Sequence, residues 1–244
     1  MFGRYLLVPK KPYGLLCPIS RACELLEPRW TIQILTELWN GSSRFNDIKR
    51  GVGNISPTLL SKRLAELEGT GLVERVEDKA TGSVDYFRTR KAVELEPALH
   101  ALAQWAQRNI EAEAALLDPD VSTMMWNVRR GVNLDEFPLR RVIIRFHFAD
   151  ENLQYDTYWM VCQPGTLPEM CTYEPGFDVD LYVETNVTSF SAIMYCRSSV
   201  EREIEENALF LSGDQRLART MDSWMAKTYY ADVEGVAPLR KERL

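Results

Sequence analysis

Small hydroxyl-bearing and basic side chains gather in one short stretch of the chain, within residues 45–73. Those that could bind DNA are Ser56, Thr58, Ser61 and Lys62. In a helix, which turns by about 100° per residue, Thr58, Ser61 and Lys62 point the same way. Hydroxyl and ammonium groups can hydrogen-bond base edges, and the major groove of DNA admits a helix. Taken alone, the stretch fits a DNA-reading helix and an ordinary surface helix equally well.

The ends and the back of this helix are also marked in the sequence. Ser56 is a good N-cap, because its hydroxyl can accept a hydrogen bond from a helix amide, and Pro57 suits the first helical position. Gly71 is a plausible end. The apolar back consists of Leu60, Leu64 and Leu67. A short helix from Phe45 and a glycine-containing turn precede it, so we expect a helix-turn-helix.

Basic residues around this motif are natural partners for phosphate groups. They are Arg44, Lys49, Arg50 and, in a later loop, Lys79. Solvation alone is the alternative for each of them. Arg63 is also a DNA-binding candidate, although its helical angle places it on the leucine side. There it could reach a phosphate or pair with a carboxylate, and we favour the structural role.

Further elements complete a winged-helix order. Helices are expected from near Pro18 and over residues 29–39, before the motif. Strands over residues 72–77 and 84–89, joined by the polar turn 78–83, predict a hairpin after it. This order favours DNA binding over a small α+β unit without a DNA role.

A long helix is predicted from Leu95 to Leu116, with Pro97 in its first turn. Apolar side chains recur in it at steps of three or four residues. These seam residues are Leu95, Leu99, Leu102, Ala106 and Ile110. Such a seam can pair with its twin in a homodimer that reads two half-sites. The alternative is a helix that packs only within its own domain.

A domain boundary is predicted after residue 117, where Asp118-Pro119-Asp120 breaks the helix. The two domains, 1–117 and 118–244, differ in charge within a chain of net charge −6. Residues 1–117 carry 16 Lys and Arg against 14 Asp and Glu, a net charge of +2. Residues 118–244 carry 13 against 21, a net charge of −8. Phosphate would repel the second domain, so double-stranded DNA is expected to contact the first.

No motif for catalysis or for metal binding is found. A Gly-x-Ser-x-Gly elbow, a phosphate loop and a His-Glu-x-x-His pair are all missing, so we predict no enzyme activity, no cofactor and no metal. The five cysteines have no Cys-x-x-Cys spacing, which favours reduced thiols in a cytoplasm. No apolar run reaches about 18 residues, and neither a membrane span nor a signal peptide is expected.

Residues 118–244 predict an α+β domain with a mostly antiparallel sheet and helices on one face. Helices are expected over residues 121–130 and 188–196 and after Asp214. Strands are expected over residues 141–148, 155–162, 178–184 and 209–211.

Residues 17–110 resemble the HxlR family of winged-helix transcriptional regulators. The resemblance rests on Cys17-Pro18, Arg29-Trp30-Thr31, Ile34–Leu38, Arg44–Ile48, Ile55–Leu64 and Leu67-Glu68 followed by Gly71-Leu72-Val73. It implies a dimeric DNA-binding regulator. The chain departs at the wing, where Ala80–Ser83 stands in place of the usual prolines. Some family members sense electrophiles through the cysteine that matches Cys17, which implies a redox role; we favour a small buried residue instead.

Residues 121–228 look like a sterol carrier protein-type lipid-transfer domain. The resemblance rests on Asp178–Val183, on the helix that follows and on Leu211–Asp214 before the last helix. It implies an apolar tunnel between sheet and helices. The candidate lining residues are Trp126, Phe146, Trp159, Phe190, Met194 and Trp224. The alternative is that these side chains simply fill a core.

We therefore expect a cytoplasmic, dimeric transcription factor whose second domain binds an apolar or amphipathic small molecule. Alternatively, the second domain is only a dimerisation scaffold. A third reading is a lipid-carrier protein or enzyme whose winged helix contacts another protein.

Overall fold

The computed structural model describes residues 13–239 and contains two compact units, which divide between His100 and Ala101. Each unit has an apolar core of its own. The division falls inside a helix, earlier in the chain than the boundary predicted after residue 117. None of the described helices is long and apolar enough to cross a membrane.

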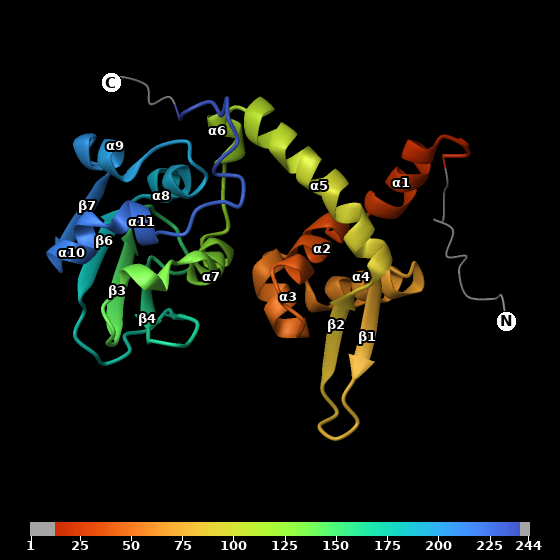
Figure 1. Cartoon of the computed structure of the whole chain (residues 1–244), viewed down its shortest axis with the longest axis horizontal. Coiled ribbons are helices and arrows are strands. Elements are labelled where there is room, and N and C mark those ends of the chain that lie inside the picture. The colour runs from red at the N-terminus through yellow and green to blue at the C-terminus, as the bar shows by residue number, and fades with distance from the viewer. Residues whose placement is uncertain (1–12, 240–244) are drawn as a thin grey trace. The chain divides into compact units, whose positions relative to one another are not determined.

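The first unit holds four helices, a two-stranded hairpin and the start of a long fifth helix (Figure 1). The bounds are α1 Pro18–Leu26, α2 Thr31–Trp39, α3 Phe45–Val52, α4 Pro57–Gly69, β1 Val73–Glu77, β2 Val84–Arg88 and α5 Arg90–Asn109. Strands β1 and β2 are antiparallel. The predicted order of helix-turn-helix and hairpin is confirmed.

The core of the first unit collects apolar side chains from α2, α3, α4 and β1. The predicted leucine stripe is buried there, with Leu60 0%, Leu64 1% and Leu67 3% exposed. Burying each of these side chains contributes roughly 1.5–3 kcal/mol. The stripe therefore fixes the rotation of α4, so that its opposite side faces outward.

Helices α2 and α3 approach so closely that position 51 has no room for a side chain. A Cβ on Gly51 would lie 2.0 Å from the carboxyl carbon of Glu37. Glu37 is 2% exposed and accepts a hydrogen bond from the Ser42 hydroxyl at 2.6 Å, so it is poorly placed to move aside. Gly51 thus leaves room for the buried Glu37 carboxylate between α3 and α2.

Helix α5 differs from the prediction at both ends. It begins at Arg90 rather than Leu95, so Pro97 lies inside the helix and not in its first turn. The Thr89 hydroxyl accepts a hydrogen bond from the amide of Ala92 at 3.3 Å and caps this earlier start. The helix ends at Asn109, and residues 112–115 form a separate short helix.

The second unit is a mixed sheet with helices (Figure 1). The bounds are α6 Ala112–Ala115, α7 Val121–Gly131, the 3-10 helix η1 Leu134–Glu136, β3 Val142–Phe148, β4 Thr157–Cys162, β5 Glu169–Cys171, β6 Leu181–Thr185, α8 Val187–Met194, α9 Val200–Glu205, β7 Leu209–Gly213, α10 Gln215–Arg219 and α11 Met221–Trp224. The strand order is β5-β4-β3-β6-β7. Strands β3 and β6 are parallel, and every other neighbouring pair is antiparallel.

One face of this sheet supplies the core of the second unit. Alternate side chains of β3, from Val142 to Phe148, are buried against residues of α7, α8, α10 and α11. Arg145 and His147 lie on the other face and are only partly buried. This is the alternation expected of a strand that is covered on one side.

Candidate nucleic-acid interface

Both ends of α4 are fixed by local hydrogen bonds. The Ser56 hydroxyl accepts from the amide of Leu59 at 3.3 Å, and Pro57 occupies the first turn. At the other end Gly71 has a φ of 72°, and the amide of Leu72 returns to the carbonyl of Leu67 at 2.9 Å. Glycine has no Cβ, so it adopts this left-handed conformation at the end of a helix without steric strain. These contacts therefore fix where α4 begins and where it ends.

The outward side of α4 carries Thr58, Ser61 and Lys62, all exposed. The side chain of Lys62 is 64% exposed, and its Nζ lies 4.0 Å from Glu66 Oε1, one turn later. Exposed pairs at this spacing contribute little to stability. The ammonium group is therefore able to leave Glu66 for a stronger anion such as phosphate, or for a base edge.

Arg63 has a different environment from Lys62. Its side chain is 16% exposed, its Nε donates to the carbonyl of Arg29 at 3.0 Å, and its guanidinium pairs with Glu66. These donors tie α4 to the residues before α2 instead of pointing toward solvent. We therefore remove Arg63 from the set of DNA contacts and assign it the positioning role.

The predicted phosphate partners are held to different degrees. Arg44 Nε lies 2.9 Å from Asp85 Oδ1, and a β-bridge joins the same two residues, so Arg44 ties α3 to the hairpin. Arg50 is exposed and 3.7 Å from Asp47. Lys49 is partly buried and Lys79 is exposed. Lys49, Arg50 and Lys79 remain the better candidates for phosphate contact.

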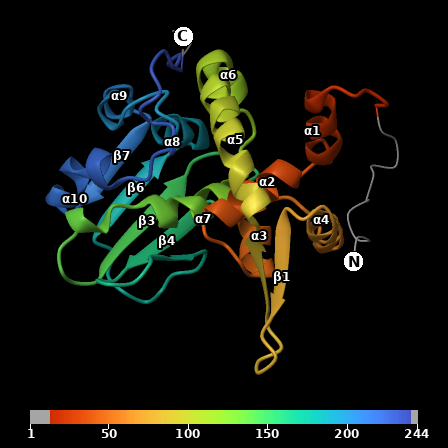
Figure 2. The same ribbon diagram turned by 45° about the vertical axis from the view of Figure 1, so that its right-hand side comes forward.

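The hairpin loop is ordered around Asp78 and needs no proline. The carboxylate accepts from the amide of Ala80 and the hydroxyl of Thr81, each at 2.8 Å, and these donors hold the pKa of Asp78 below its usual value. The amide of Gly82, with a φ of 68°, donates to the Asp78 carbonyl at 2.7 Å. Figure 2 shows the hairpin extending well past α3 and α4.

The charges of the hairpin do not favour close contact with DNA. Glu74, Glu77 and Asp78 are exposed there beside Arg75 and Lys79. Arg75 also lies 3.2 Å from Glu77. A hydrogen bond to this carboxylate raises the pKa of Arg75, and the carboxylate offsets the charge of the guanidinium. Phosphate would thus meet a net negative wing with one cation, Lys79, at its tip.

The predicted dimer seam is not one continuous stripe. Leu99 is 8% exposed and Leu95 and Ala106 are partly buried, whereas Leu102 is 51% exposed. Ile110, 39% exposed, lies in the break after α5. Trp105 is not among the predicted seam residues, yet it is 55% exposed on the same helix. A large exposed aromatic residue on a helix was the signal that could have found it.

The predicted ligand-lining residues are not brought together around one site. Phe146, Phe190, Met194 and Trp224 belong to one packed core, in which the Phe146 and Phe190 rings meet edge to face at 5.6 Å. Trp159 pairs in register with Arg145 and therefore lies on the opposite face of the sheet. Trp126 lies against Arg129, whose guanidinium carbon is 3.6 Å from the ring centroid. Four of the six candidates thus belong to the buried core, Trp126 and Trp159 do not, and this arrangement gives the tunnel expectation no support.

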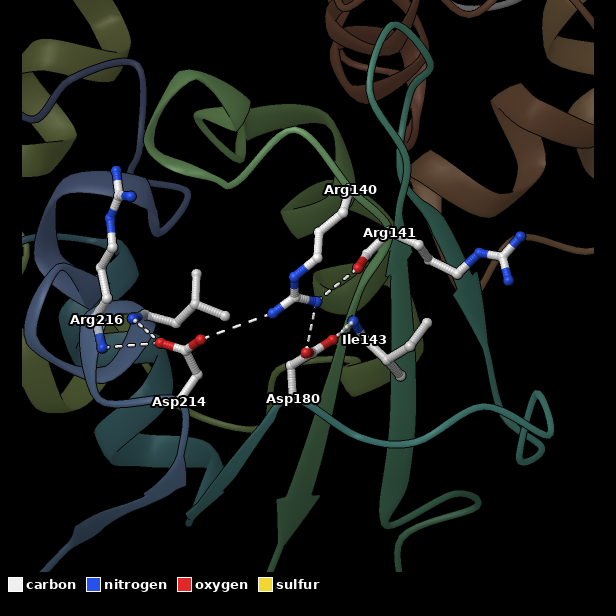
Figure 3. A network of polar contacts seen from close by, with 7 residues as sticks. Arg140, Arg141, Ile143, Asp180, Asp214 and Arg216 are labelled. Atoms are coloured by element: carbon white, nitrogen blue, oxygen red, sulfur yellow. Dashed lines mark hydrogen bonds and ion pairs between the residues drawn. The ribbon is translucent and has the colours of Figure 1, made fainter.

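Two aspartates of the sterol-carrier resemblance have structural roles (Figure 3). Asp180 accepts from the amide of Ile143 at 2.8 Å and from Arg140 at 2.7 Å. Asp214 caps α10, accepting from the Arg216 amide at 2.8 Å, and lies 3.8 Å from the same Arg140. The network joins the starts of β3 and β6 to the end of β7. These motif residues thus hold one end of the sheet together and imply no lipid.

Cys17 is exposed, which contradicts the favoured view that it is a buried residue. It stands at the N-cap of α1, where the backbone amides of Ser20 and Ile19 lower the pKa of its thiol. By contrast, burial raises the pKa of the Cys162 thiol to about 12. No cluster of three metal-ligating side chains occurs among the described residues.

We expect Cys17 to be alkylated first and Cys162 last when the native protein is treated with iodoacetamide near neutral pH. The thiolate is the reactive form, and the pKa of Cys162 implies a thiolate fraction roughly a thousandfold below that of an ordinary thiol. Peptide mass spectrometry over time measures each rate. A Cys17 rate no higher than that of partly buried Cys171 would refute the expectation, and Cys17→Ser should remove the fastest phase.

The residues of the helix-turn-helix and its neighbours match a known protein family. The family described as HxlR-like helix-turn-helix matches residues 25–114. The uncharacterised HTH-type transcriptional regulator YvaP of Bacillus subtilis is 37% identical over 98 residues, which are 39% of this chain and 91% of that protein. The chain belongs to the HxlR family.

Other HxlR-like relatives agree over the same part of the chain. The uncharacterised regulator YkvN of Bacillus subtilis is 31% identical over 110 residues, covering 43% of this chain and 93% of that protein. The reduced transcriptional regulator YodB of the same organism is 32% identical, covering 40% of this chain and 97% of that one, with a TM-score of 0.36. The family match and the curated relatives make the first unit that of a DNA-binding transcriptional regulator, and residues 115–244 lie outside the family match.

Proposed function

We propose that this chain is a homodimeric, cytoplasmic transcription regulator that places α4 in the major groove of its operator. The proposal is carried by one observation: α4 is locked by a buried leucine stripe, with Thr58, Ser61 and Lys62 exposed on its other side. Membership of the HxlR family supports it. In this proposal Lys62 and the hydroxyls read the groove, and Lys49, Arg50 and Lys79 contact phosphates.

Lys62→Ala tests the placement of α4. If Lys62 hydrogen-bonds a base, its loss should weaken operator binding by about 1–3 kcal/mol and relax specificity at that position. Gel shifts on an operator selected from random-sequence DNA, compared with unselected DNA, measure both effects. Lys227→Ala, which removes the same charge from the second unit, is the control.

Equal losses on operator and unselected DNA would make Lys62 a phosphate contact. Unchanged binding on both would remove α4 from the groove and refute the proposal.

The dimer is proposed to form through the exposed apolar side chains of α5. Leu102→Asp should then yield monomers with reduced operator affinity, because a carboxylate buried against apolar surface costs several kcal/mol. Analytical ultracentrifugation gives the mass. Gln104→Asp introduces the same charge about 200° around the helix and should leave the dimer intact. A dimeric Leu102→Asp protein would place the interface elsewhere.

The second unit is proposed to bind a small-molecule effector. Phe146, Phe190, Met194 and Trp224 belong to its buried core, which supports a site at the surface rather than between sheet and helices. A dimerisation scaffold is the second candidate, and this core supports it as well. The lipid-carrier alternative loses its support with the tunnel.

A further inference from the structure

The second unit has an open hollow on its surface of about 400 Å³. This volume lies within the range of about 300–1,000 Å³ that small-molecule sites occupy. Its walls come from segments distant in sequence: α6, the link to α7, the turn after β3 and the start of α8. None of the side chains predicted to bind a ligand lines it.

The floor of the hollow is apolar and fixed. Leu116 is 5%, Val121 8% and Val187 5% exposed, so these side chains are anchored in the fold and present only an edge. Leu117, which is 72% exposed, adds a large apolar surface beside them. A ligand can therefore bury apolar area here without any rearrangement of the core.

The rim of the hollow is acidic. Glu113, Asp118, Asp150 and Glu151 line it, and no Lys, Arg or His of residues 13–239 does. Asp150 accepts from the amide of Val187 at 2.8 Å and so offsets the positive end of α8. Neither Asp118 nor Glu151 is ion-paired with a cation among the described residues. Their negative charge is therefore available to a cation that enters the hollow.

We propose that this hollow binds an amphipathic organic cation, with its apolar body on the leucine and valine floor and its positive group beside Asp118 and Glu151. An organic anion would be repelled, and a neutral ligand would gain nothing from the rim. The inference rests on the proposed function in one respect: the cation would be the effector. The wall residues between 113 and 121 come shortly after the end of α5 at Asn109, and α5 begins in the DNA-binding unit.

Tetraphenylphosphonium and tetraphenylborate test this proposal, because they are apolar ions of the same shape and opposite charge. Isothermal titration of the full chain at low ionic strength should show saturable binding of the cation and at least tenfold weaker binding of the anion. The double variant Asp118→Asn, Glu151→Gln should weaken cation binding by about tenfold, because it removes two carboxylates that attract the cation across water. Leu117→Ser should weaken it also.

The control is Glu201→Gln, Glu205→Gln, which removes two exposed carboxylates of α9 that do not line the hollow and should leave the affinity unchanged. Equal binding of the two ions, absence of saturable cation binding, or an unchanged affinity in the Asp118, Glu151 variant would each overturn the proposal. The titration contains no DNA. Failure of the ligand-free protein to bind an operator would refute the regulator function and leave this result standing.

Discussion

Arg197→Met is expected to destabilise the second unit by about 3–5 kcal/mol. Arg197 is 2% exposed, and its guanidinium donates to three backbone carbonyls: Ala237 at 2.9 Å, Gln107 at 2.8 Å and Ile110 at 3.1 Å. Methionine fills much of the same volume but has no donor, so three part-buried carbonyls would lose this partner and the space vacated by the buried guanidinium would have no polar group.

Hydrogen exchange followed by mass spectrometry, over a urea series, assigns this loss to segments of the chain. Peptides from the last turn of α5 and the break after it should lose protection first, because the acceptors Gln107 and Ile110 lie there. Arg219→Met is the control, since Arg219 is exposed and, among the described residues, bonds only to Gln215 one turn away, and it should change stability by less than about 0.5 kcal/mol. A loss below about 1 kcal/mol for Arg197→Met would mean that water replaces the guanidinium.

Phe190→Ala should also cost about 3–5 kcal/mol, the usual loss for a buried phenylalanine. Phe190 is 0% exposed, and its ring meets those of Phe146 and Phe148 edge to face at 5.6 and 5.3 Å. The same change in the wall of a preformed pocket would enlarge the pocket and cost far less. Urea unfolding of the full chain therefore separates a packed core from a lipid tunnel.

Phe210→Ala is the matched control for this measurement. Phe210 is 56% exposed on β7, so truncation removes little buried area and should cost less than about 1 kcal/mol. Similar losses at the two positions would contradict the assignment of Phe190 to the core.

Features that depend on residues near in sequence could be predicted. The cap at Ser56, the stripe of Leu60, Leu64 and Leu67, and the closing Gly71 were all read correctly, because each is set by neighbours within one or two turns. The strand pattern of residues 142–148 was readable for the same reason. The family resemblance over the first unit then gave the DNA-binding role.

Features that depend on distant contacts were missed. Near the end of α5 the carbonyl of Gln107 accepts from Arg197, a residue 90 positions later, and nothing in the local periodicity of residues 95–116 predicts this contact. The structural role of Arg63 depends on the carbonyl of Arg29, although its helical angle gave a correct hint. Trp159 could have been excluded from the pocket, because alternation along β4 places it opposite Tyr158 and Met160. An aromatic side chain suggested a pocket residue, whereas its position on the strand indicated the other face of the sheet.

The order of strands also governs how this chain folds as it is synthesised. Strands β3 and β4 can pair as soon as their connecting turn exists, but β6 pairs with β3 in parallel across the whole intervening segment. Closing so long a loop costs entropy before any contact offsets it, which makes such pairings slow. The first unit, built from neighbouring helices and a hairpin, has no such delay. A nascent chain ending before β6 therefore carries a finished DNA-binding unit beside apolar strand faces that lack their partner, and at that stage it is most prone to aggregation.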